Sequence, residues 1–189
     1  MGIHPLLLDL DPAHQIPLAS LIKVKNLNVD CERIFPFKEK IFTENFAPYQ
    51  VVIFDMGEMV KFNSSQISNV DIVALVTIPE IYSLVETYVL CKLISINSGH
   101  NHLALIANRI REKKTAQEGL EILFRVAEKF FPGKISLLGF VPELSSSTKN
   151  QPLVFYDKKD FSSAIDEITK NLLRFCSFSQ ENKTQEVKR

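Results

Sequence analysis

The sequence lacks several features that define particular classes of protein. It has no tryptophan and a formal net charge of zero, because 22 basic side chains are balanced by 22 acidic ones. Binders of nucleic acid usually carry a basic excess, so this balance argues against a specific nucleic-acid function. The three cysteines, Cys31, Cys91 and Cys176, are odd in number and lie far apart. They predict no disulfide framework and favour reduced thiols in a cytoplasmic protein.

Long apolar runs are also missing. None approaches the roughly 20 residues that a membrane-spanning helix needs. The short run at 6–8 is closed by Asp9 and Asp11 and has no basic segment before it, so no signal peptide is expected. The composition is 46% hydrophobic and 23% charged, as in a globular chain. The length predicts one domain over residues 1–178 and a polar tail over 179–189.

Continuous apolar runs alternate with helical patterns along most of the chain. Such runs predict strands buried on both faces, and apolar residues spaced three and four apart predict helices. The alternation therefore predicts an α/β fold with a mostly parallel sheet flanked by helices. Residues 13–48 carry no clear pattern. The predicted strands are 5–10, 50–55, 71–77, 102–107 and 135–141, and the predicted helices are 79–96, 114–131 and 160–175.

Polar residues follow four of these predicted strands, where ligands of parallel α/β sheets bind. They are Asp9 with Asp11, Asp55, Asn108 with Arg109, and Pro142 with Glu143. A carboxylate at a strand end, such as Asp55, can hold a water of a hydrated magnesium ion. Taken alone, such an acid is as often a turn residue or a helix cap.

Six segments, taken in order, resemble the MinD/ParA branch of the P-loop ATPases, and most of all its flagellar-number regulators of the FlhG type. The resemblance covers most of residues 5–175 and implies a P-loop NTPase fold. The segments are LLLDLDPAH (6–14), VVIFDMGEM (51–59), DIVALVTIPEIYSLVETYVLCKLI (71–94), LALIANRIREKKTAQEGLEILFRVAEKFF (103–131), LLGFVPE (137–143) and NQPLVFYDKKDFSSAIDEI (150–168).

The resemblance also implies roles for residues and the cofactors ATP or ADP and magnesium. Asp9 would help order the attacking water if the protein is active, and Asp11 would belong to the nucleotide site. Asp55 would serve magnesium. Asn108 would contact the adenine base, which the loop at Pro142–Glu143 would cover. The turn Thr77-x-Pro79-Glu80 matches a further motif of the family.

The departures from the family bear on activity. None of the six glycines lies in a phosphate loop of the form G-x-x-x-x-G-K-[ST], and Met56 stands where the family has threonine or serine. In the family, the loop precedes the segment matched by 6–14, so we expect the first strand, the loop and the first helix to be absent. The stretch between Asp11 and Asp55 is also shorter than in the family. Without the loop the main phosphate contacts are lost, and hydrolysis by this chain alone is not expected.

Three functional hypotheses remain open. The first is a non-hydrolysing regulator that binds a protein partner, with a homodimer as one form. The second is an ATPase whose phosphate loop lies outside this chain, and the third is a scaffold that binds no nucleotide. Relatives can bind membrane through a C-terminal amphipathic segment, but core packing explains the apolar residues of the last helix equally well.

Other residues favour unspecialised interpretations. His100 and His102 form an H-x-H pair that can suit a metal, but no third ligand is near in the sequence, so a solvated loop is favoured. Cys91 lies in an apolar helical stretch and is predicted to be a buried thiol. The basic residues at 109–114 are predicted to be a solvated helix start rather than a nucleic-acid site.

Overall fold

The computed structural model describes residues 5–10, 30–33, 45–47, 49–57, 67, 69–100, 102–143 and 159–186; of residues 9, 33 and 176–186 only the backbone is described. The chain has an α/β fold with parallel strands, as predicted, but the described strands form two three-stranded sheets rather than the one sheet expected. It divides into two compact units, Met1–Asn69 and Val70–Arg189. The expectation of one domain over 1–178 stays a prediction. No helix within the described residues is both long and apolar enough to cross a membrane.

The first unit contains a parallel three-stranded sheet with the order β2-β1-β3. Its strands are β1 (Pro5–Asp9), β2 (Asp30–Arg33) and β3 (Val51–Asp55). The strands predicted at 5–10 and 50–55 are confirmed, whereas β2 lies in the stretch that carries no clear pattern. The expected burial of 50–55 on both faces is wrong, because Val51 and Ile53 are 39% and 51% exposed. β1 is the central strand, and Leu6 and Leu8 are buried. Register places Asp9 beside Asp55 at the carboxyl ends of β1 and β3.

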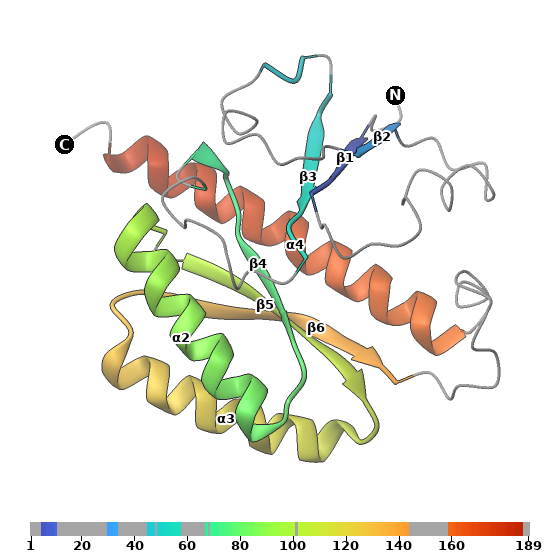
Figure 1. The fold of residues 1–189 in the computed structure, drawn as a ribbon, viewed down its shortest axis with the longest axis vertical. Helices are drawn as coiled ribbons and strands as arrows, with labels where there is room; N and C mark the ends of the chain where they lie inside the picture. Colours follow the sequence, from blue (N-terminus) through green and yellow to red (C-terminus); the bar gives the residue numbers. More distant parts are fainter. Residues whose placement is uncertain are drawn as a thin grey trace. The chain divides into compact units, whose positions relative to one another are not determined.

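The second unit contains a parallel three-stranded sheet with the order β4-β5-β6, flanked by helices (Figure 1). Helices α2 and α3 cover one face of this sheet, and α4 covers the other (Figure 1). The elements are β4 (Ala74–Thr77), α2 (Ile81–Ser98), β5 (His102–Ile110), α3 (Lys113–Phe130), β6 (Lys134–Pro142) and α4 (Lys159–Glu186).

The elements of the second unit were all predicted, but their bounds differ, most of all at the ends of β5 and α4. β4 begins at Ala74 rather than at 71, and α2 ends at Ser98 rather than at 96. β5 continues to Ile110 rather than ending at 107, because it pairs with β6 beyond Asn108. α4 continues to Glu186 rather than ending at 175. Its last turns have no apolar pattern, but Gln, Glu and Lys have good helix propensity and extend a helix that packing has already started.

The core of the second unit lies on both faces of β5. Leu103, Ala104, Leu105 and Ala107 have no exposed surface. Residues on a strand alternate between faces, so Ala104 packs with α4 while its neighbours pack beneath α2 and α3. The α4 side is a cluster made up of Ala104, Leu138, Ile168 and Phe175.

A bulge in β6 brings its backbone close to α4. Leu105 pairs with Leu137 and Ile106 with Gly139, so Leu138 is an extra residue. The side-chain amide of Asn171 on α4 donates to the Leu138 carbonyl oxygen at 2.8 Å. A Cβ at Gly139 would lie only 2.7 Å from Cγ1 of Ile168. Glycine is therefore required at this position by close packing rather than by backbone conformation.

We predict that Gly139→Ala destabilises the protein by about 1–3 kcal/mol, the usual cost of overpacking a core. The clashing atom is close to the helix backbone and cannot swing away. The measurement is urea unfolding of Gly139→Ala, Ile168→Ala and the double variant. Removing Cγ1 of Ile168 should remove most of the cost of the added methyl group. Equal costs in both backgrounds would contradict this account.

Candidate functional site

The carboxyl end of β5 contains a second bulge, at Asn108 and Arg109. Ala107 pairs with Phe140 and Ile110 with Pro142, so two residues of β5 lie opposite Val141 alone. Arg109 has a φ of 57°, the left-handed conformation that costs a side chain about 1–2 kcal/mol. Bulges at the ends of strands redirect side chains and are frequent beside binding sites. The polar residues predicted here therefore sit on an irregular, strained segment.

The bulge and the end of β6 are joined by an ion-pair cluster. Arg111 binds both carboxylate oxygens of Glu143, through Nε to Oε2 and through Nη2 to Oε1. Arg109 Nη2 donates to Glu143 Oε1 at 3.2 Å. The backbone N–H of Glu143 donates to the Ile110 carbonyl oxygen at 2.9 Å, which extends the strand pairing past Pro142. One carboxylate thus holds two arginines from the neighbouring strand end.

This cluster changes the electrostatics of the predicted basic patch. The hydrogen bond from Arg111, followed by that from Arg109, lowers the pKa of Glu143, and the same bond raises the pKa of Arg111. The two arginine side chains remain exposed, with 59% and 81% of their surface accessible. Nζ of Lys113 lies 5.3 Å from the centre of the Phe140 ring. The patch is solvated, as predicted, but two of its charges are paired.

Asn108 lies half-buried beside this cluster. Its Oδ1 accepts a hydrogen bond from the backbone N–H of Arg109 at 2.9 Å, which fixes the side-chain amide on the bulge. An amide oxygen has a second lone pair and the amide nitrogen has two donors. The structure therefore brings Asn108, Pro142 and Glu143 together at the ends of two adjacent strands, as the sequence predicts.

The acidic residues belong to the first unit. Asp55 Oδ1 accepts a hydrogen bond from the backbone N–H of Gly57 at 3.1 Å, and Gly57 has a φ of 57°. Asp55 therefore has the contact of a turn residue, the common role of an acid at the end of a strand. The side chain of Asp9, and all of Asp11, lie outside the described residues.

A magnesium role for Asp55 has limited chemical support. In the described part of the chain, no group of three or more His, Cys, Asp or Glu side chains is placed to hold a metal. Magnesium keeps several waters and often contacts protein through one carboxylate. Asp55 has one carboxylate oxygen outside its turn bond, so it fits a contact through a bound water and not a protein cage.

The Thr77-x-Pro79-Glu80 turn has a structural role that the sequence did not reveal. Thr87 on α2 donates through Oγ1 to the Oγ1 of Thr77 at 2.7 Å, and both side chains are buried. The hydroxyl of Thr87 also lies 2.7 Å from the Ser83 carbonyl oxygen. These bonds tie the end of β4 to α2. No local pattern marks Thr87, because its partner lies on another element.

The remaining candidates have packed, unreactive environments. The solvated loop favoured for the histidine pair is wrong for His102, which is the first residue of β5. Its Nε2 lies 2.9 Å from Ser136 Oγ, and its ring centre is 4.3 Å from that of Phe175. Burial, with a smaller contribution from Lys134, lowers the pKa of His102. Cys91 is fully buried, which raises its pKa to about 12 and confirms the prediction of a buried thiol.

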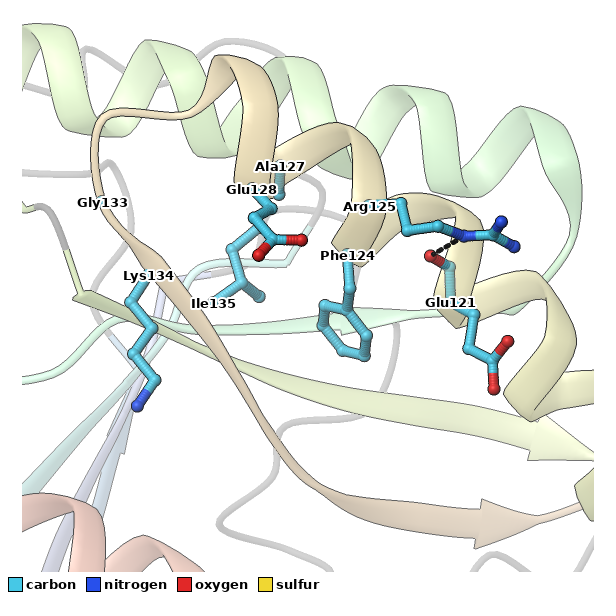
Figure 2. A pocket seen from close by; sticks show the side chains of 8 residues that line it. All are labelled: Glu121, Phe124, Arg125, Ala127, Glu128, Gly133, Lys134 and Ile135. Carbon is cyan, nitrogen blue, oxygen red and sulfur yellow. Dashed lines mark hydrogen bonds between the residues drawn. The ribbon is translucent and has the colours of Figure 1, made fainter.

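A shallow pocket of about 520 Å³ lies at the opposite end of β6 (Figure 2). Its lining mixes both charge signs, and Arg125 Nε donates to the Glu121 carbonyl oxygen at 3.4 Å. Ligands of parallel sheets bind at carboxyl ends, whereas this pocket lies at the amino end of β6. The pocket is lined by Glu121, Phe124, Arg125, Ala127, Glu128, Gly133, Lys134 and Ile135.

Comparison of the chain with models of protein families finds no match, and comparison with curated proteins finds none either. The site is therefore defined by its own geometry: a polar bulge and an arginine–glutamate cluster at the ends of β5 and β6.

We predict that the Glu143 carboxyl group titrates below its ordinary pKa because Arg111 and Arg109 stabilise its charge. Arg111→Gln should raise the pKa more than Arg109→Gln, since Arg111 makes the larger contribution. Carboxyl-carbon NMR titration measures both shifts. Arg125→Gln, a variant of an exposed arginine on α3, is the control and should leave Glu143 unchanged. A wild-type Glu143 pKa at its ordinary value would contradict the ion pairing with Arg111 and Arg109.

We also predict that His102 makes the protein less stable in acid. Its pKa is lowered on folding, so between its folded pKa and about 6.5 the unfolded chain binds more protons. The free energy of unfolding should therefore fall as pH decreases from about 7.5 to 5. His102→Phe keeps a ring against Phe175 and should show a smaller fall in urea unfolding. An unchanged pH dependence in the variant would argue against this role.

Proposed function

We propose that this chain is a degenerate MinD/ParA-like protein that binds an adenine nucleotide weakly and acts by binding a protein partner rather than by hydrolysis. The observation that carries the proposal is the strained bulge that presents Asn108 beside Pro142 and Glu143. The α/β architecture and the parallel strands support the P-loop NTPase fold that the sequence resemblance implies. A flagellar or cell-pole role in the cytoplasm rests on that resemblance alone.

The chemistry of Asn108 supports adenine as the ligand. An asparagine amide can accept from N6 of adenine and donate to N7 at the same time. The existing bond from Arg109 uses one lone pair of Oδ1 and leaves the amide oriented. Pro142 adds an apolar ring at the end of the next strand, where the flat face of a base can pack.

Phosphate binding is the weak part of the site. The 189 residues contain no glycine-rich, lysine-bearing phosphate loop, so this chain alone lacks the backbone donors that neutralise a triphosphate. The exposed guanidinium groups of Arg109 and Arg111 are engaged with Glu143 and offer partial compensation. Asp55 would contact hydrated magnesium, and Asp9 would orient water only in an active enzyme. We therefore propose binding without turnover.

The ATPase and scaffold hypotheses each predict a result that differs from that of the proposed regulator. If the phosphate loop lies outside this chain, adding the segment that contains it should produce magnesium-dependent ATP hydrolysis that Asp55→Ala abolishes. If the chain is a scaffold without a nucleotide site, neither ATP nor ADP should stabilise it. The proposed regulator differs from both: it binds an adenine nucleotide but does not hydrolyse it.

We predict that ATP and ADP raise the melting temperature of the chain modestly and that Asn108→Ala removes the rise. A ligand that binds only the folded state stabilises it by RT ln(1 + [L]/Kd), about 2.7 kcal/mol at a hundredfold excess over Kd. Asn108→Ala should raise the Kd by about tenfold or more, because a bidentate contact to adenine is worth about 1–3 kcal/mol. Thermal unfolding and calorimetric titration measure these effects.

Asn97→Ala is the matched control, since Asn97 is an exposed amide in the last turn of α2. It should leave the nucleotide response unchanged. Guanine nucleotides should bind less well than adenine nucleotides, because guanine presents O6 where adenine has a donor. Equal responses of wild type and Asn108→Ala would refute base recognition at the bulge, and ATP turnover by the purified chain would refute the absence of hydrolysis.

A further inference from the structure

Helix α2 is apolar on its outward face as well as on its buried face. Leu84, Cys91 and Ile94 point into the core. Tyr82 and Ile96, on the other side of the helix, are 83% and 72% exposed. Spacings of three and four residues place a continuous stripe along this side. Its members are Tyr82, Val85, Val89, Leu93 and Ile96, with Ile81 beside them.

Helix α3 adds a second apolar stripe next to the first. Ile122, Val126 and Phe130 follow one another at intervals of four and are exposed. A Cβ at Gly119 would lie 3.1 Å from the Pro79 carbonyl oxygen and 3.4 Å from Leu84 Cδ1, so this flank of α3 faces α2. Ile122 and Val126 share that flank, because they lie three and seven residues beyond Gly119. The two stripes together form the α2–α3 apolar surface.

This surface is large enough for a stable interface. The biggest apolar patch on a typical monomer covers about 300–600 Å². A standard protein–protein interface needs about 800 Å² from each partner. The α2–α3 apolar surface gathers large side chains that each expose between 36% and 83% of their area, and together they reach that order.

The charges beside the stripes are segregated along the helices. Beside the stripes, Glu86 and Glu118 lie in the amino-terminal halves of α2 and α3, and Lys92, Arg125 and Lys129 lie in the carboxyl-terminal halves. By helical spacing, the other charges of α3 lie further round the helix; they are Lys113, Lys114, Glu121 and Glu128. Both helices connect parallel strands, so they run in the same direction. A second copy placed antiparallel sets the acidic half of one surface against the basic half of the other. A parallel placement sets acid against acid.

We propose that the α2–α3 apolar surface binds a second copy of this chain around a two-fold axis, with the four helices antiparallel across the interface. Such an interface is isologous: each copy contributes the same surface, and each acidic half meets a basic half. This inference rests on the proposed function, since it identifies the protein partner as a second copy of the chain. The dimer itself requires no bound nucleotide. Charges of both signs lie beside the stripes, which suits a protein surface of the same mixed charge better than an anionic membrane.

The first test is sedimentation equilibrium of the full chain without nucleotide. Wild type should dimerise, and Val89→Glu should raise the dimer dissociation constant by about tenfold or more, since it buries a charge at the centre of the interface. Leu173→Glu, at an exposed leucine of α4, is the matched control and should dimerise like wild type. Circular dichroism checks that each variant is folded. A monomeric wild type, or a dimeric Val89→Glu, would overturn the proposal.

A charge-reversal pair tests the orientation. Glu86→Lys with Glu118→Lys leaves only basic side chains beside the stripes, and Lys92→Glu with Lys129→Glu leaves Arg125 as the one basic side chain beside them. Each double variant alone should be monomeric, and a mixture of the two should form a heterodimer. Failure of the mixture to associate would exclude the antiparallel arrangement. Flotation of the wild type with anionic vesicles, abolished by Val89→Glu, would instead assign the surface to membrane. None of these outcomes depends on Asn108, so dimerisation and nucleotide binding are tested separately.

Discussion

The burial of β5 on both faces is the constraint on which the second unit depends. Its central residues have no exposed surface, and a parallel strand in that position must be covered from both sides. Helix α4 provides one cover, and α2 and α3 provide the other. The bulge at Leu138 and the glycine after it follow from the same requirement, because they let α4 approach the sheet closely enough to exclude water.

The candidate site begins where that coverage ends. Apolar packing is interrupted after Ala107 and resumes only at Ile110, and the chain places Asn108 and two arginines around this point at the edge of the sheet. Glu143, from the end of the next strand, neutralises part of the positive charge there. The buried hydroxyl bond between Thr77 and Thr87 fixes the end of β4 in a similar way. The strand ends are thus held by polar contacts, while the strand centres are held by burial.

The sequence predicted the parts of this fold that depend on burial alone. The apolar runs at 102–107 and 135–141 marked β5 and β6, because strands covered on both faces need apolar residues throughout. The run at 50–55 marked β3 as a strand but not its environment, since Val51 and Ile53 are 39% and 51% exposed. β2 (DCER) was not predicted, since Glu32 and Asp30 are exposed and the strand has no apolar run.

The site was predicted only in part, for a related reason. Strand ends grouped Asn108 with Pro142 and Glu143. The bulge depends on the register between two strands, and the arginine–glutamate cluster depends on side chains from different strands. Neither the bulge nor the cluster produces a pattern among neighbouring residues of the sequence. The outward stripe of α2 was also hidden, because a helix that is apolar all round has no periodicity to show which face is exposed.

The bulge at Asn108 and Arg109 also shifts the phase of the strand. Ala107 and Ile110 pair with Phe140 and Pro142, so both face the same side of the sheet although three positions separate them. Regular alternation would have turned Ile110 to the opposite face. The extra residue therefore lets the strand keep a buried isoleucine at its end while two successive polar residues are displayed before it. Insertions and deletions at this point change the number of polar positions and the phase of the strand together, so the length of this segment is as strongly constrained as its residue types.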